Sequence, residues 1–315
     1  MRLNMVFIMD PIGTINTEKD TTFVLMLESQ SRGHRVYYLE SRDLFVKGGK
    51  AWGEVAEISL KRGEDYYRFL ETDTVPLESF DVVWMRKDPP FNMDYVYATY
   101  ILSLIDPEKV LIINNPKGIR ESNEKLYSLY FPDLIPESAV SKDKNRLKTF
   151  LKEVGGEMVV KPLHSYGGEG VFYVKEGDKN ANVIIETITE GGNRYVLAQK
   201  FIEKVLEGDK RIILLNGEPL GAVLRIAGAG DFRCNFHSGG SPAATRLDER
   251  DLEICRGIAP KLREDGLYFV GIDVIGGYLT EINTTSPTGV QEINKLNGIK
   301  LEAQVIDFVE ERCKR

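Results

Sequence analysis

The segment from Phe269 to Gly289, which reads FVGIDVIGGYLTEINTTSPTG, constrains the fold of this chain more than any other stretch. Two apolar, β-branched runs flank Gly276-Gly277, and this pattern predicts a tight β-hairpin. The hairpin contains three oxygen-bearing side chains, Asp273, Glu281 and Asn283. Because a hard cation such as Mg²⁺ prefers oxygen ligands, the hairpin is a candidate metal site.

The length of the turn decides whether the two acids share a face. A two-residue turn at Gly276-Gly277 would pair Asp273 with Thr280 and leave Asp273 and Glu281 on opposite faces. A three-residue loop over 276–278 would pair Asp273 with Glu281 on one face. We expect this second register, because it also gives the reverse face a mostly apolar set of side chains for the core. The further pairs that it predicts are Gly271 with Asn283, Ile272 with Ile282, and Val274 with Thr280.

An ordinary hairpin with two surface carboxylates is the plain alternative. The segment that follows, Thr284 to Gly289, is hard to reconcile with that alternative, because it is small, rich in hydroxyl groups and ends on glycine. Such a loop is suited to holding a substrate directly beside the proposed metal strand. We therefore interpret the hairpin as a platform for a metal ion and a triphosphate.

Composition allows a large core and limits the partners. The chain has 315 residues, 42% hydrophobic and 28% charged, which suggests two or three packed units. A net charge of −7 argues against a broad nucleic-acid surface. The cysteines, Cys234, Cys255 and Cys313, have neither disulfide nor zinc spacing, which fits a reducing cytoplasm. The apolar run near the N-terminus, about five residues long, is too short to cross a membrane.

The first part of the chain alternates strands and helices. This order predicts a parallel, doubly wound domain, whose ligands lie beyond the carboxyl ends of the strands. The expected elements are strands over 3–9, 35–40, 81–85 and 110–114, hairpins within 44–75, a helix capped by Thr21-Thr22 that runs to about Arg32, and a helix over 94–105.

A charged loop, Arg86-Lys87-Asp88-Pro89-Pro90, follows the strand at 81–85. Two prolines restrict the backbone there, and two cations beside a carboxylate at a strand end suit an anionic substrate. A solvated surface loop is an equal alternative on these residues alone. Arg86 and Asp88 are therefore candidate substrate-binding residues.

The middle of the chain carries features of a phosphate site. Lys125 lies in the first turn of a helix expected over 124–130, and Lys161 lies near the end of a strand expected over 158–162. The loop SYGGEG at 165–170 lets backbone N–H groups close over phosphates, although a tight hairpin uses the same residues. The apolar strand at 195–202 either holds a flat base against this loop or forms an ordinary part of the core.

The last third of the chain adds further arginines. Arg211 opens one strand, and Arg225 lies in the middle of the next, where apolar neighbours make an anionic partner necessary. The glycine-rich loop 227–240, which carries Arg233 and Asn235, has the composition of a lid that excludes water. The remaining expected elements are a helix from Asp248 to about Glu264 and a closing amphipathic helix over 300–315.

The order of these features resembles the ATP-grasp superfamily of carboxylate–amine ligases, and more closely the bacterial glutathione synthetase family. The similarity covers essentially the whole chain. RKDPPF together with LTEIN and TSPTG is its most specific part. The motifs that carry it are MDPI (9–12), RKDPPF (86–91), YATYIL (97–102), NEKL (123–126), VKPL (160–163), EGDKRI (207–212), LTEIN (279–283) and TSPTG (285–289).

The resemblance implies an α/β chain with the ATP-grasp fold in three units. These are an N-terminal substrate-binding domain with a doubly wound parallel sheet (1–122), a central lid domain (123–203) and a C-terminal catalytic domain (204–315). It also implies a cytoplasmic homotetramer that ligates γ-L-glutamyl-L-cysteine and glycine to glutathione through an acyl phosphate. ATP and Mg²⁺, with Mn²⁺ as a substitute ion, are the implied cofactors, and neither nucleic acid nor a membrane is an implied partner.

The resemblance also assigns roles to individual residues. The implied metal ligands are Asp273, Glu281 and Asn283. The implied catalytic residues are Arg225, Arg211 and Arg233. The implied ATP-binding residues are Lys125, Lys161, Tyr166, Gly167, Gly168, Gln199, Lys200, Phe201, Ile202 and Asp209. The implied substrate-binding residues are Arg86, Asp88, Asn235, Ser286, Pro287 and Thr288.

Two positions depart from the family pattern. His164 stands where the family usually has an Asp after VKPL, and Gln291 stands where an Arg usually precedes Glu292. If that arginine helps to hold a substrate carboxylate, the binding of γ-glutamylcysteine is weakened or its specificity altered. The ATP and metal residues are unaffected by either change.

Three other functions stay open on the sequence. Another ATP-grasp peptide ligase would use a different acyl donor or amine. A nucleotide-binding regulator would keep the pocket without turnover, and a phosphotransferase would stop at the phosphorylated carboxylate.

Overall fold

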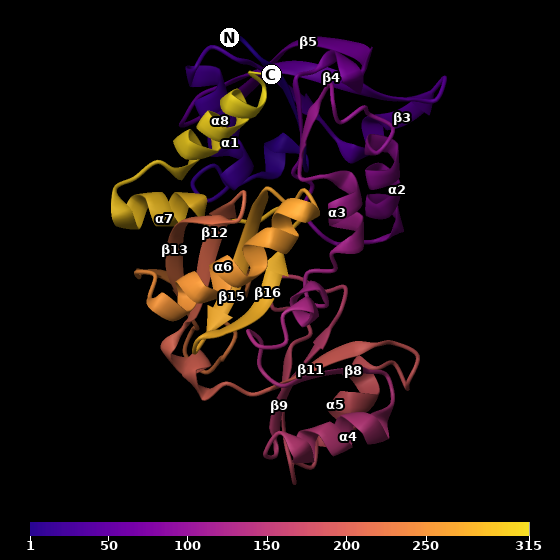
Figure 1. Cartoon of the computed structure of the whole chain (residues 1–315), viewed down its shortest axis with the longest axis vertical. Coiled ribbons are helices and arrows are strands. Elements are labelled where there is room, and N and C mark those ends of the chain that lie inside the picture. The colour runs from indigo at the N-terminus through magenta and orange to yellow at the C-terminus, as the bar shows by residue number, and fades with distance from the viewer. Residues whose placement is uncertain (315) are drawn as a thin grey trace.

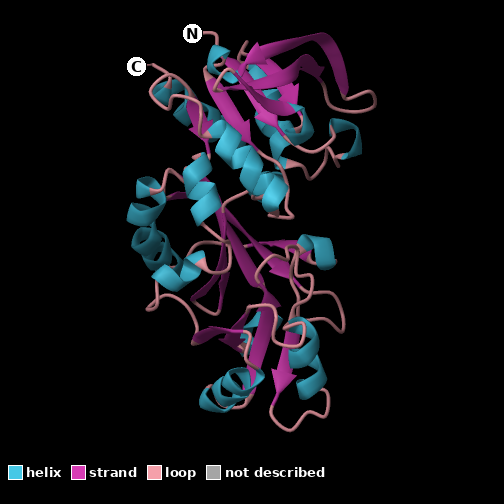
Figure 2. Cartoon of the chain, turned by 90° about the vertical axis from the view of Figure 1, so that its right-hand side faces the viewer, coloured by secondary structure: helices cyan, strands magenta, loops and turns pink. Residues whose placement is uncertain are grey.

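The computed structural model describes residues 1–314, and these residues form three β-sheets of seven, four and five strands. Figure 1 shows the sheets along the long axis of the molecule: the N-terminal sheet lies at one end, the C-terminal sheet in the middle and the sheet from the middle of the sequence at the other end. Both chain termini lie at the N-terminal end. The side view in Figure 2 shows the same elongated arrangement.

The N-terminal sheet has the order β3-β4-β2-β1-β6-β7, with β5 paired to β4. Its core is parallel, because β1 pairs in parallel with β2 and β6, and β6 pairs in parallel with β7. This confirms the prediction of a parallel sheet and of hairpins over 44–75. The strands are β1 (Asn4–Ile8), β2 (Arg35–Leu39), β3 (Leu44–Lys47), β4 (Lys50–Leu60), β5 (Tyr67–Pro76), β6 (Val82–Met85) and β7 (Leu111–Ile113).

Three helices belong to this sheet: α1 (Thr21–Ser31), α2 (Met93–Leu102) and α3 (Pro116–Glu121). The predicted cap of α1 was wrong, because the N-cap is Asp20, whose carboxylate accepts the Phe23 N–H at 2.6 Å. The C-terminal helix α8 (Leu301–Arg312) packs on α1 (Figure 1). An ion pair of 2.6 Å between Arg32 and Asp307 joins the chain just after α1 to α8, so the end of the chain covers its beginning.

The four-stranded sheet has the order β10-β9-β11-β8 and is antiparallel, with two helices packed against it. Its side chains form an apolar cluster of their own, which includes Leu147, Val160 and Ile185. The elements are β8 (Ser138–Ser141), α4 (Lys144–Glu153), β9 (Glu157–Pro162), β10 (Phe172–Lys175), α5 (Ala181–Ile188) and β11 (Val196–Lys200).

The five-stranded sheet has the order β14-β13-β12-β15-β16, and its pairings are antiparallel. The helix predicted after Asp248 is confirmed, since that side chain caps α6 within a capping box. The elements are β12 (Asp209–Leu215), β13 (Glu218–Ile226), β14 (Ser241–Ala244), α6 (Glu249–Glu264), β15 (Phe269–Ile275), β16 (Tyr278–Asn283) and α7 (Val290–Asn297).

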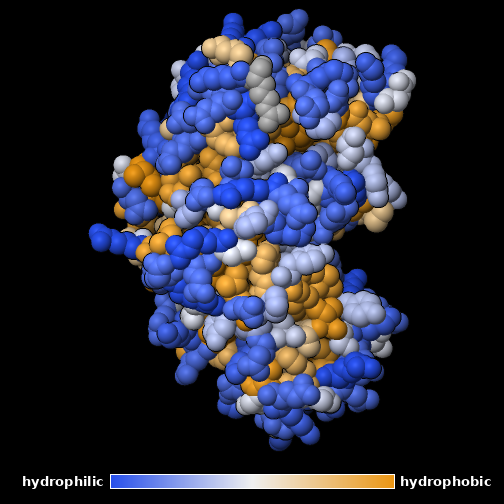
Figure 3. Space-filling view, in the orientation of Figure 1, coloured by the Kyte–Doolittle hydropathy of each residue, from blue (hydrophilic) through white to orange (hydrophobic). Residues whose placement is uncertain are grey.

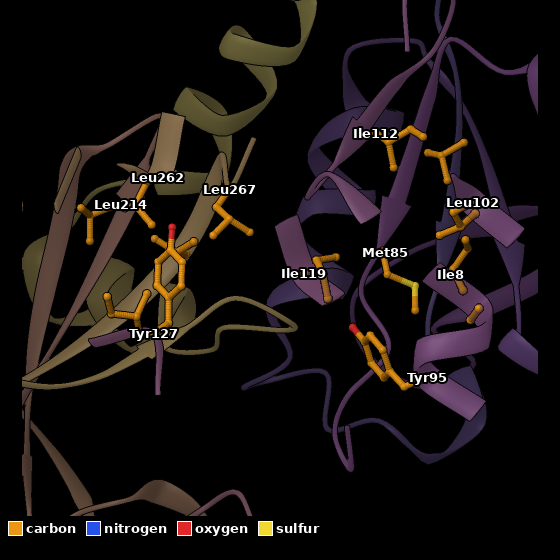
Figure 4. Packing of buried hydrophobic residues seen from close by; sticks show 14 of the residues in the cluster. Ile8, Met85, Tyr95, Leu102, Ile112, Ile119, Tyr127, Leu214, Leu262 and Leu267 are labelled. Carbon is orange, nitrogen blue, oxygen red and sulfur yellow. The ribbon is translucent and has the colours of Figure 1, made fainter. Parts of the chain in front are cut away.

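The N-terminal and five-stranded sheets share apolar clusters. One cluster joins Ile8 and Met85 of the N-terminal sheet to Leu214 of the five-stranded sheet and Leu262 of α6. Figure 4 shows the two groups of side chains. The face seen in Figure 3 is mostly hydrophilic, with apolar residues showing in several patches between the hydrophilic ones. The N-terminal and five-stranded units therefore share apolar cores, whereas the four-stranded unit has an apolar core of its own.

The structure differs from the prediction in several short segments. Instead of a helix over 124–130, a capped turn leads into a 3₁₀ helix over Tyr127–Tyr130, because the Asn123 side chain accepts the N–H groups of both Lys125 and Leu126. The helices α3, α5 and α7 were not predicted, since each has at most eight residues, which is too short a stretch for a helical pattern to be distinguished from a loop. Position 315, the end of the predicted closing helix, lies outside the described residues. Within residues 1–314, no helix has the length and apolarity needed to cross a membrane.

Candidate active site

One face of the five-stranded sheet carries a row of charged side chains, which the strand pairing brings together. Asp209 and Arg211 are two residues apart on β12 and therefore share a face. Arg225 lies opposite Asp209, Asp273 lies opposite Arg211, and Glu281 lies opposite Asp273. We call this set of five side chains the charged wall.

The predicted pairing of the hairpin is confirmed, although the predicted loop is wrong. Asp273 pairs with Glu281, Ile272 with Ile282 and Gly271 with Asn283. The turn itself is the two-residue one, with Ile275 paired to Tyr278 and Val274 to Leu279 rather than to Thr280. A β-bulge between Asp273 and Val274 restores the register, since Thr280 is the extra residue there.

The charged wall is internally cross-linked. Arg211 Nε lies 2.6 Å from Asp273 Oδ1, and Arg225 Nη2 lies 2.9 Å from Asp273 Oδ2 and also pairs with Asp209. Burial alone would raise the pKa of Asp273, but the charges of Arg211 and Arg225 outweigh it and hold that pKa below its usual range. Burial raises the pKa of Asp209 despite the charge of Arg225. Arg225 Nε and Asp209 Oδ1 are buried without a hydrogen-bond partner, so this network keeps unused polar atoms.

The four-stranded sheet contributes a different surface. Lys161 on β9 donates to Gln199 Oε1 on β11 at 2.8 Å, and Gln199 Nε2 donates to Ser138 Oγ at 3.1 Å. Burial lowers the pKa of Lys161, because its hydrogen-bond partner is a neutral amide. We call Lys161, Gln199 and the glycine loop 165–170 the lysine wall.

Lys125 connects the two walls. Its ammonium group lies 3.0 Å from Glu281 Oε1 on the charged wall and also donates to the carbonyl oxygen of Ser165 in the glycine loop. The side chain is buried, and it reaches this position because the turn after Asn123 enters directly between the two sheets.

A first cavity lies between the two walls. Both walls and the segment 199–202 border it, and it has an apolar side suited to a flat ring. Its lining includes Lys125, Val159, Lys161, Gly168, Val171, Gln199, Lys200, Phe201, Ile202, Asp209, Phe232, Arg233, Asn235, Asp273, Thr280 and Glu281.

A second cavity lies beside the first, toward the N-terminal sheet. Glu281 and Asn235 border both cavities, so the two spaces meet at these side chains. The lining of the second cavity is Asp88, Pro89, Glu124, Tyr166, Gly167, Arg211, Arg225, Asn235, Phe236, His237, Glu281, Asn283, Thr285, Ser286, Pro287 and Thr288.

The glycine loop and the loop 227–240 lie against one another over the cavities. Ser238 Oγ donates to the Gly167 carbonyl at 2.7 Å, and Arg233 donates to the Gly168 carbonyl at 3.3 Å. Gly168 has φ +82°, and a Cβ there would lie 2.7 Å from Asn235 Oδ1. Only glycine therefore permits this close approach of the two loops.

Comparison with known proteins matches nearly the whole chain to one family. Residues 3–120 match the family model of the prokaryotic glutathione synthetase N-terminal domain, and residues 124–298 match that of the prokaryotic glutathione synthetase ATP-grasp domain. The chain is 46% identical to the glutathione synthetase of Thermosynechococcus vestitus, over 98% of this chain and 99% of that one. It is 42% identical to the glutathione synthetase of Vibrio parahaemolyticus, over 99% of each chain.

The chain belongs to the prokaryotic glutathione synthetase family. It is accordingly an ATP-dependent ligase of glutathione biosynthesis, which acts on small molecules and uses ATP with a divalent metal ion. Solved structures agree on the ATP-grasp fold. The ligase PsnB, complexed with a precursor peptide and AMPPNP, matches with a TM-score of 0.65 at 14% identity over 99% of this chain and 98% of that one. The D-alanine–D-alanine ligase of Bacillus anthracis, complexed with ATP, matches with a TM-score of 0.58 at 14% identity over 99% of each chain.

The donor atoms on the hairpin fit a divalent ion. Asn283 Nδ2 lies 3.4 Å from Asp273 Oδ2, and rotating this amide by half a turn brings its oxygen to the same side. Asp273 Oδ1 accepts one hydrogen bond, from Arg211, so one of its acceptor directions stays open. Within residues 1–314, no three His, Cys, Asp or Glu side chains gather into a metal cluster. The set thus has two carboxylates and one amide, which is oxygen chemistry that suits a hard cation.

The structure brings most of the predicted residues to the two cavities, with three differences of position. Tyr166 and Gly167, predicted to bind ATP, border the second cavity instead of the first. Arg86, predicted to bind substrate, is not among the lining residues of either cavity. It donates to Thr22 Oγ1 and to the Pro287 carbonyl, and its Nη1 is buried without a partner.

The two departures from the family pattern lie outside the lining of both cavities. His164 Nε2 lies 3.0 Å from Arg194 Nη1, and partial burial together with this charge lowers the pKa of His164. Gln291 Nε2 donates to the carbonyl oxygens of Thr17 at 2.9 Å and Asp20 at 2.7 Å. Gln291 therefore joins α7 to the loop before α1.

The sequence did not indicate one charged residue of the second cavity, Glu124, or part of the apolar lining of the first, although Phe201 and Ile202 of that lining were predicted. Glu124 stands beside Lys125 in the NEKL motif, and its carboxylate turns toward the loop after β16. No spacing rule marks it, because the partners lie about 160 positions away in the sequence. Val159 alternates with the buried Met158 and Val160 on β9, and only this alternation could have indicated that it faces a ligand, whereas Val171 lies just before β10.

Proposed function

We propose that this chain joins γ-L-glutamyl-L-cysteine to glycine through an acyl phosphate and releases glutathione, ADP and phosphate. The observation that carries the proposal is the meeting of the two cavities at Glu281. A triphosphate in the first cavity and a carboxylate in the second would then face one another. Family membership supports this pair of substrates.

In the first step, the cysteinyl carboxylate of the dipeptide attacks the γ-phosphorus, the bond to the ADP oxygen breaks, and an acyl phosphate forms. A carboxylate is a poor electrophile, and the phosphoryl group turns its oxygen into a leaving group. Lys125 and Lys161 would hold the phosphates, and Arg211 and Arg225 would neutralise charge on the transferred oxygens. The cavity positions of these four side chains support the assignments.

We further propose that the divalent ion is Mg²⁺, with Mn²⁺ as a substitute, held by Asp273, Glu281 and Asn283. When bound, this ion neutralises the phosphate oxygens and orients them. The oxygen-only donor set supports this choice over a softer metal.

In the second step, the neutral amine of glycine attacks the carbonyl carbon, a tetrahedral oxyanion forms, and phosphate leaves. Arg225 would stabilise the oxyanion, and its Nε has no hydrogen-bond partner among residues 1–314. An acyl phosphate hydrolyses readily, so water must be kept out. The loops 165–170 and 227–240, which contact each other over the cavities, would act as the lid.

We propose that the chain works as three units, 1–122, 123–203 and 204–315, and assembles as a homotetramer in the cytoplasm. The separate apolar core of the four-stranded sheet supports the middle unit. Exposed Met93, Tyr97, Tyr100 and Leu104, which follow one another at helical spacing along and just past α2, support self-association. The thiols of Cys234 and Cys255 fit a reducing compartment. Sedimentation of the purified chain tests the tetramer, and a monomer at micromolar concentration would contradict it.

The decisive experiment measures ADP release with γ-glutamylcysteine, with and without glycine. We expect release that depends on glycine, together with stoichiometric glutathione. Binding of ATP without turnover would instead indicate a regulator, and glycine-independent ADP release without peptide would indicate a phosphotransferase. Turnover that occurs only with another amine or acyl donor would indicate a different peptide ligase of the same fold.

A further inference from the structure

Glu124 lines the second cavity, and hydrogen bonds to neighbouring residues hold its side chain in place. Its Oε1 accepts three hydrogen bonds, from the N–H groups of Thr284 at 3.0 Å and Thr285 at 3.1 Å and from Thr285 Oγ1 at 2.8 Å. Its own carbonyl oxygen accepts the N–H of Ile282 at 3.0 Å. The side chain is therefore held by the strand and loop that carry the proposed metal and substrate residues.

The second carboxylate oxygen of Glu124 is in a different situation. Within residues 1–314, Oε2 makes no hydrogen bond and Glu124 has no ion-pair partner, whereas the residue lines the second cavity. The adjacent cation, Lys125, is turned away to Glu281 and the Ser165 carbonyl. One oxygen of Glu124 thus orders the loop, and the other is presented to the cavity.

Most of the other charges of this cavity are paired within the protein, whereas the exposed Asp88 has no ion-pair partner among residues 1–314. Arg211 and Arg225 are held by Asp273 and Asp209, and Glu281 is paired with Lys125. Glu124 is the partly buried carboxylate of the lining whose charge no described side chain neutralises. Burial and repulsion by Glu281 disfavour that charge, and a ligand with a positive group relieves both costs.

We propose that Glu124 binds the ammonium group of the incoming amine substrate through Oε2 and holds its nitrogen beside the acyl phosphate, and that one proton passes to Oε2 so that the nitrogen attacks as the neutral amine. This inference rests on the proposed function, and it assigns the acceptor side of the second cavity. Glu124 adjoins Glu281, where the two cavities meet, so an amine there lies beside the reacting carboxyl group. Asp88 lies on the N-terminal side of the same cavity, which Ser286 also lines, and is left for the amino group of the dipeptide.

The assignment predicts an acceptor with a positive amino group. The lining also contains Arg211 and Arg225, whose positive charges match a carboxylate on the same molecule. An α-amino acid satisfies both sides at once. A neutral nucleophile such as hydroxylamine satisfies neither, and would enter without help from Glu124.

The test is Glu124→Gln, which keeps an acceptor oxygen for Thr284 and Thr285 but removes the negative charge. We expect the KM for glycine to rise about 10- to 100-fold, the range for loss of a charged hydrogen bond, with the KM values for ATP and γ-glutamylcysteine within about twofold. Hydroxamate formation with hydroxylamine, measured at the same pH, should stay near the wild-type rate. Glu121→Gln, an exposed glutamate on α3, is the matched control.

Several results would overturn the inference. They are an equal rise in all three KM values, an equal loss with hydroxylamine, or an unchanged KM for glycine. If Glu124→Gln fails to fold, Glu124→Asp, which keeps the charge on a shorter side chain, decides the matter: the KM for glycine must rise while the hydroxylamine rate is kept. Failure of the proposed function is separate, since wild-type protein would then form no glutathione.

Discussion

The two walls of the first cavity hold their charges in opposite ways. On the charged wall, each arginine already has a carboxylate partner, and Asp273 is held by two guanidinium groups. On the lysine wall, Lys161 has only the amide of Gln199 and the glycine loop supplies backbone N–H groups. The arginines of the charged wall are thus ion-paired within the protein, whereas the lysine of the lysine wall has no carboxylate bonded to it among residues 1–314.

This difference in charge pairing indicates that the two walls have different roles in the reaction. A paired network resists rearrangement, because removing one member leaves an uncompensated buried charge. A partly buried lysine without an ion-pair partner, such as Lys161, costs folding free energy and recovers it when a phosphate binds. We therefore expect changes on the charged wall to act on the chemical step, and changes on the lysine wall to act on ATP binding.

Glu281→Gln should give the largest effect, since Glu281 faces both cavities and is a proposed metal ligand. We expect turnover to fall at least ~100-fold, by the usual size of an electrostatic contribution to the transition state. Steady-state ADP release measures it, with the exposed Glu253→Gln on α6 as control. Near-normal turnover would mean that Glu281 is not a metal ligand, and it would contradict the role in the chemical step that we assign to the charged wall.

Arg225→Lys sharpens the comparison from the charged wall. A guanidinium group that bridges Asp209 and Asp273 becomes a point charge that cannot serve both in the same geometry. We expect kcat to fall roughly 10- to 100-fold, part of the cost of losing one oxyanion donor, while the Kd for ATP changes little. Arg256→Lys, exposed on α6, is the control, and an equal loss of ATP affinity would place Arg225 with the nucleotide.

Lys161→Met tests the opposite wall and should weaken ATP binding by roughly tenfold or more, as for loss of a charged hydrogen bond. The ligand-free protein should become more stable, because burial lowers the pKa of Lys161 and so disfavours its charged form in the folded state. The sign follows from linkage: this cost is full below the folded pKa and vanishes as pH rises to the unfolded value of about 10.4.

Thermal melting at several pH values, with and without ATP, measures both effects of Lys161→Met. The gain in stability should be largest at the lowest pH and absent near pH 10.4. Lys144→Met, a partly exposed lysine at the start of α4 that pairs with Glu186 away from the cavities, is the control. A variant that is less stable than wild type at every pH would show that Lys161 is already neutralised in the folded chain.

Ser238→Ala should have a smaller effect, because it removes one hydrogen bond between the lid and the glycine loop. A single neutral hydrogen bond contributes about 0.5–1.5 kcal/mol, which corresponds to a loss of roughly 2- to 12-fold. We expect more ADP release without peptide product, since water enters more often. Ser79→Ala, far from the site, is the control, and unchanged coupling of ADP to glutathione would mean that this contact does not hold the lid.

His164→Asp should have the smallest effect, although it restores the usual residue of the family. The side chain is exposed, contacts Arg194 and lines neither cavity. A surface ion pair with Arg194 would add less than about 1 kcal/mol of stability. We expect kcat and all KM values to stay within about twofold, and a larger change would mean that this position affects the lysine wall beside it.

Much of the site could be predicted because it depends on local rules. The alternation of side chains on a strand puts Asp209 with Arg211, and the apolar reverse face of the hairpin puts Asp273 opposite Glu281. The loop was predicted wrongly because a two-residue turn followed by a bulge gives the same pairing as a three-residue loop. Periodicity cannot distinguish the two.

The remaining parts of the site depend on contacts between distant segments. Arg86 is fixed by Thr22 and Pro287, and Glu124 by Thr284 and Thr285, and nothing in the spacing of these residues along the chain reveals the contacts. The sequence of the charged loop at 86–90 would be the same whether Arg86 faced the cavity or lay outside it. The sequence therefore could not show that Arg86 is held by Thr22 and Pro287 and does not line the cavity.

The amino-acid sequence by itself determined the hairpin, its pairing, the order of the phosphate-binding features and the family, because each follows from periodicity or from motifs of a few residues. Only the tertiary structure decided which charges are neutralised inside the protein and which face a ligand. Arg225 forms ion pairs with Asp209 and Asp273. Among residues 1–314, neither Lys161 nor Glu124 forms an ion pair. The physical reason is that the energy of a charge depends on its neighbours in space, and folding alone selects those neighbours.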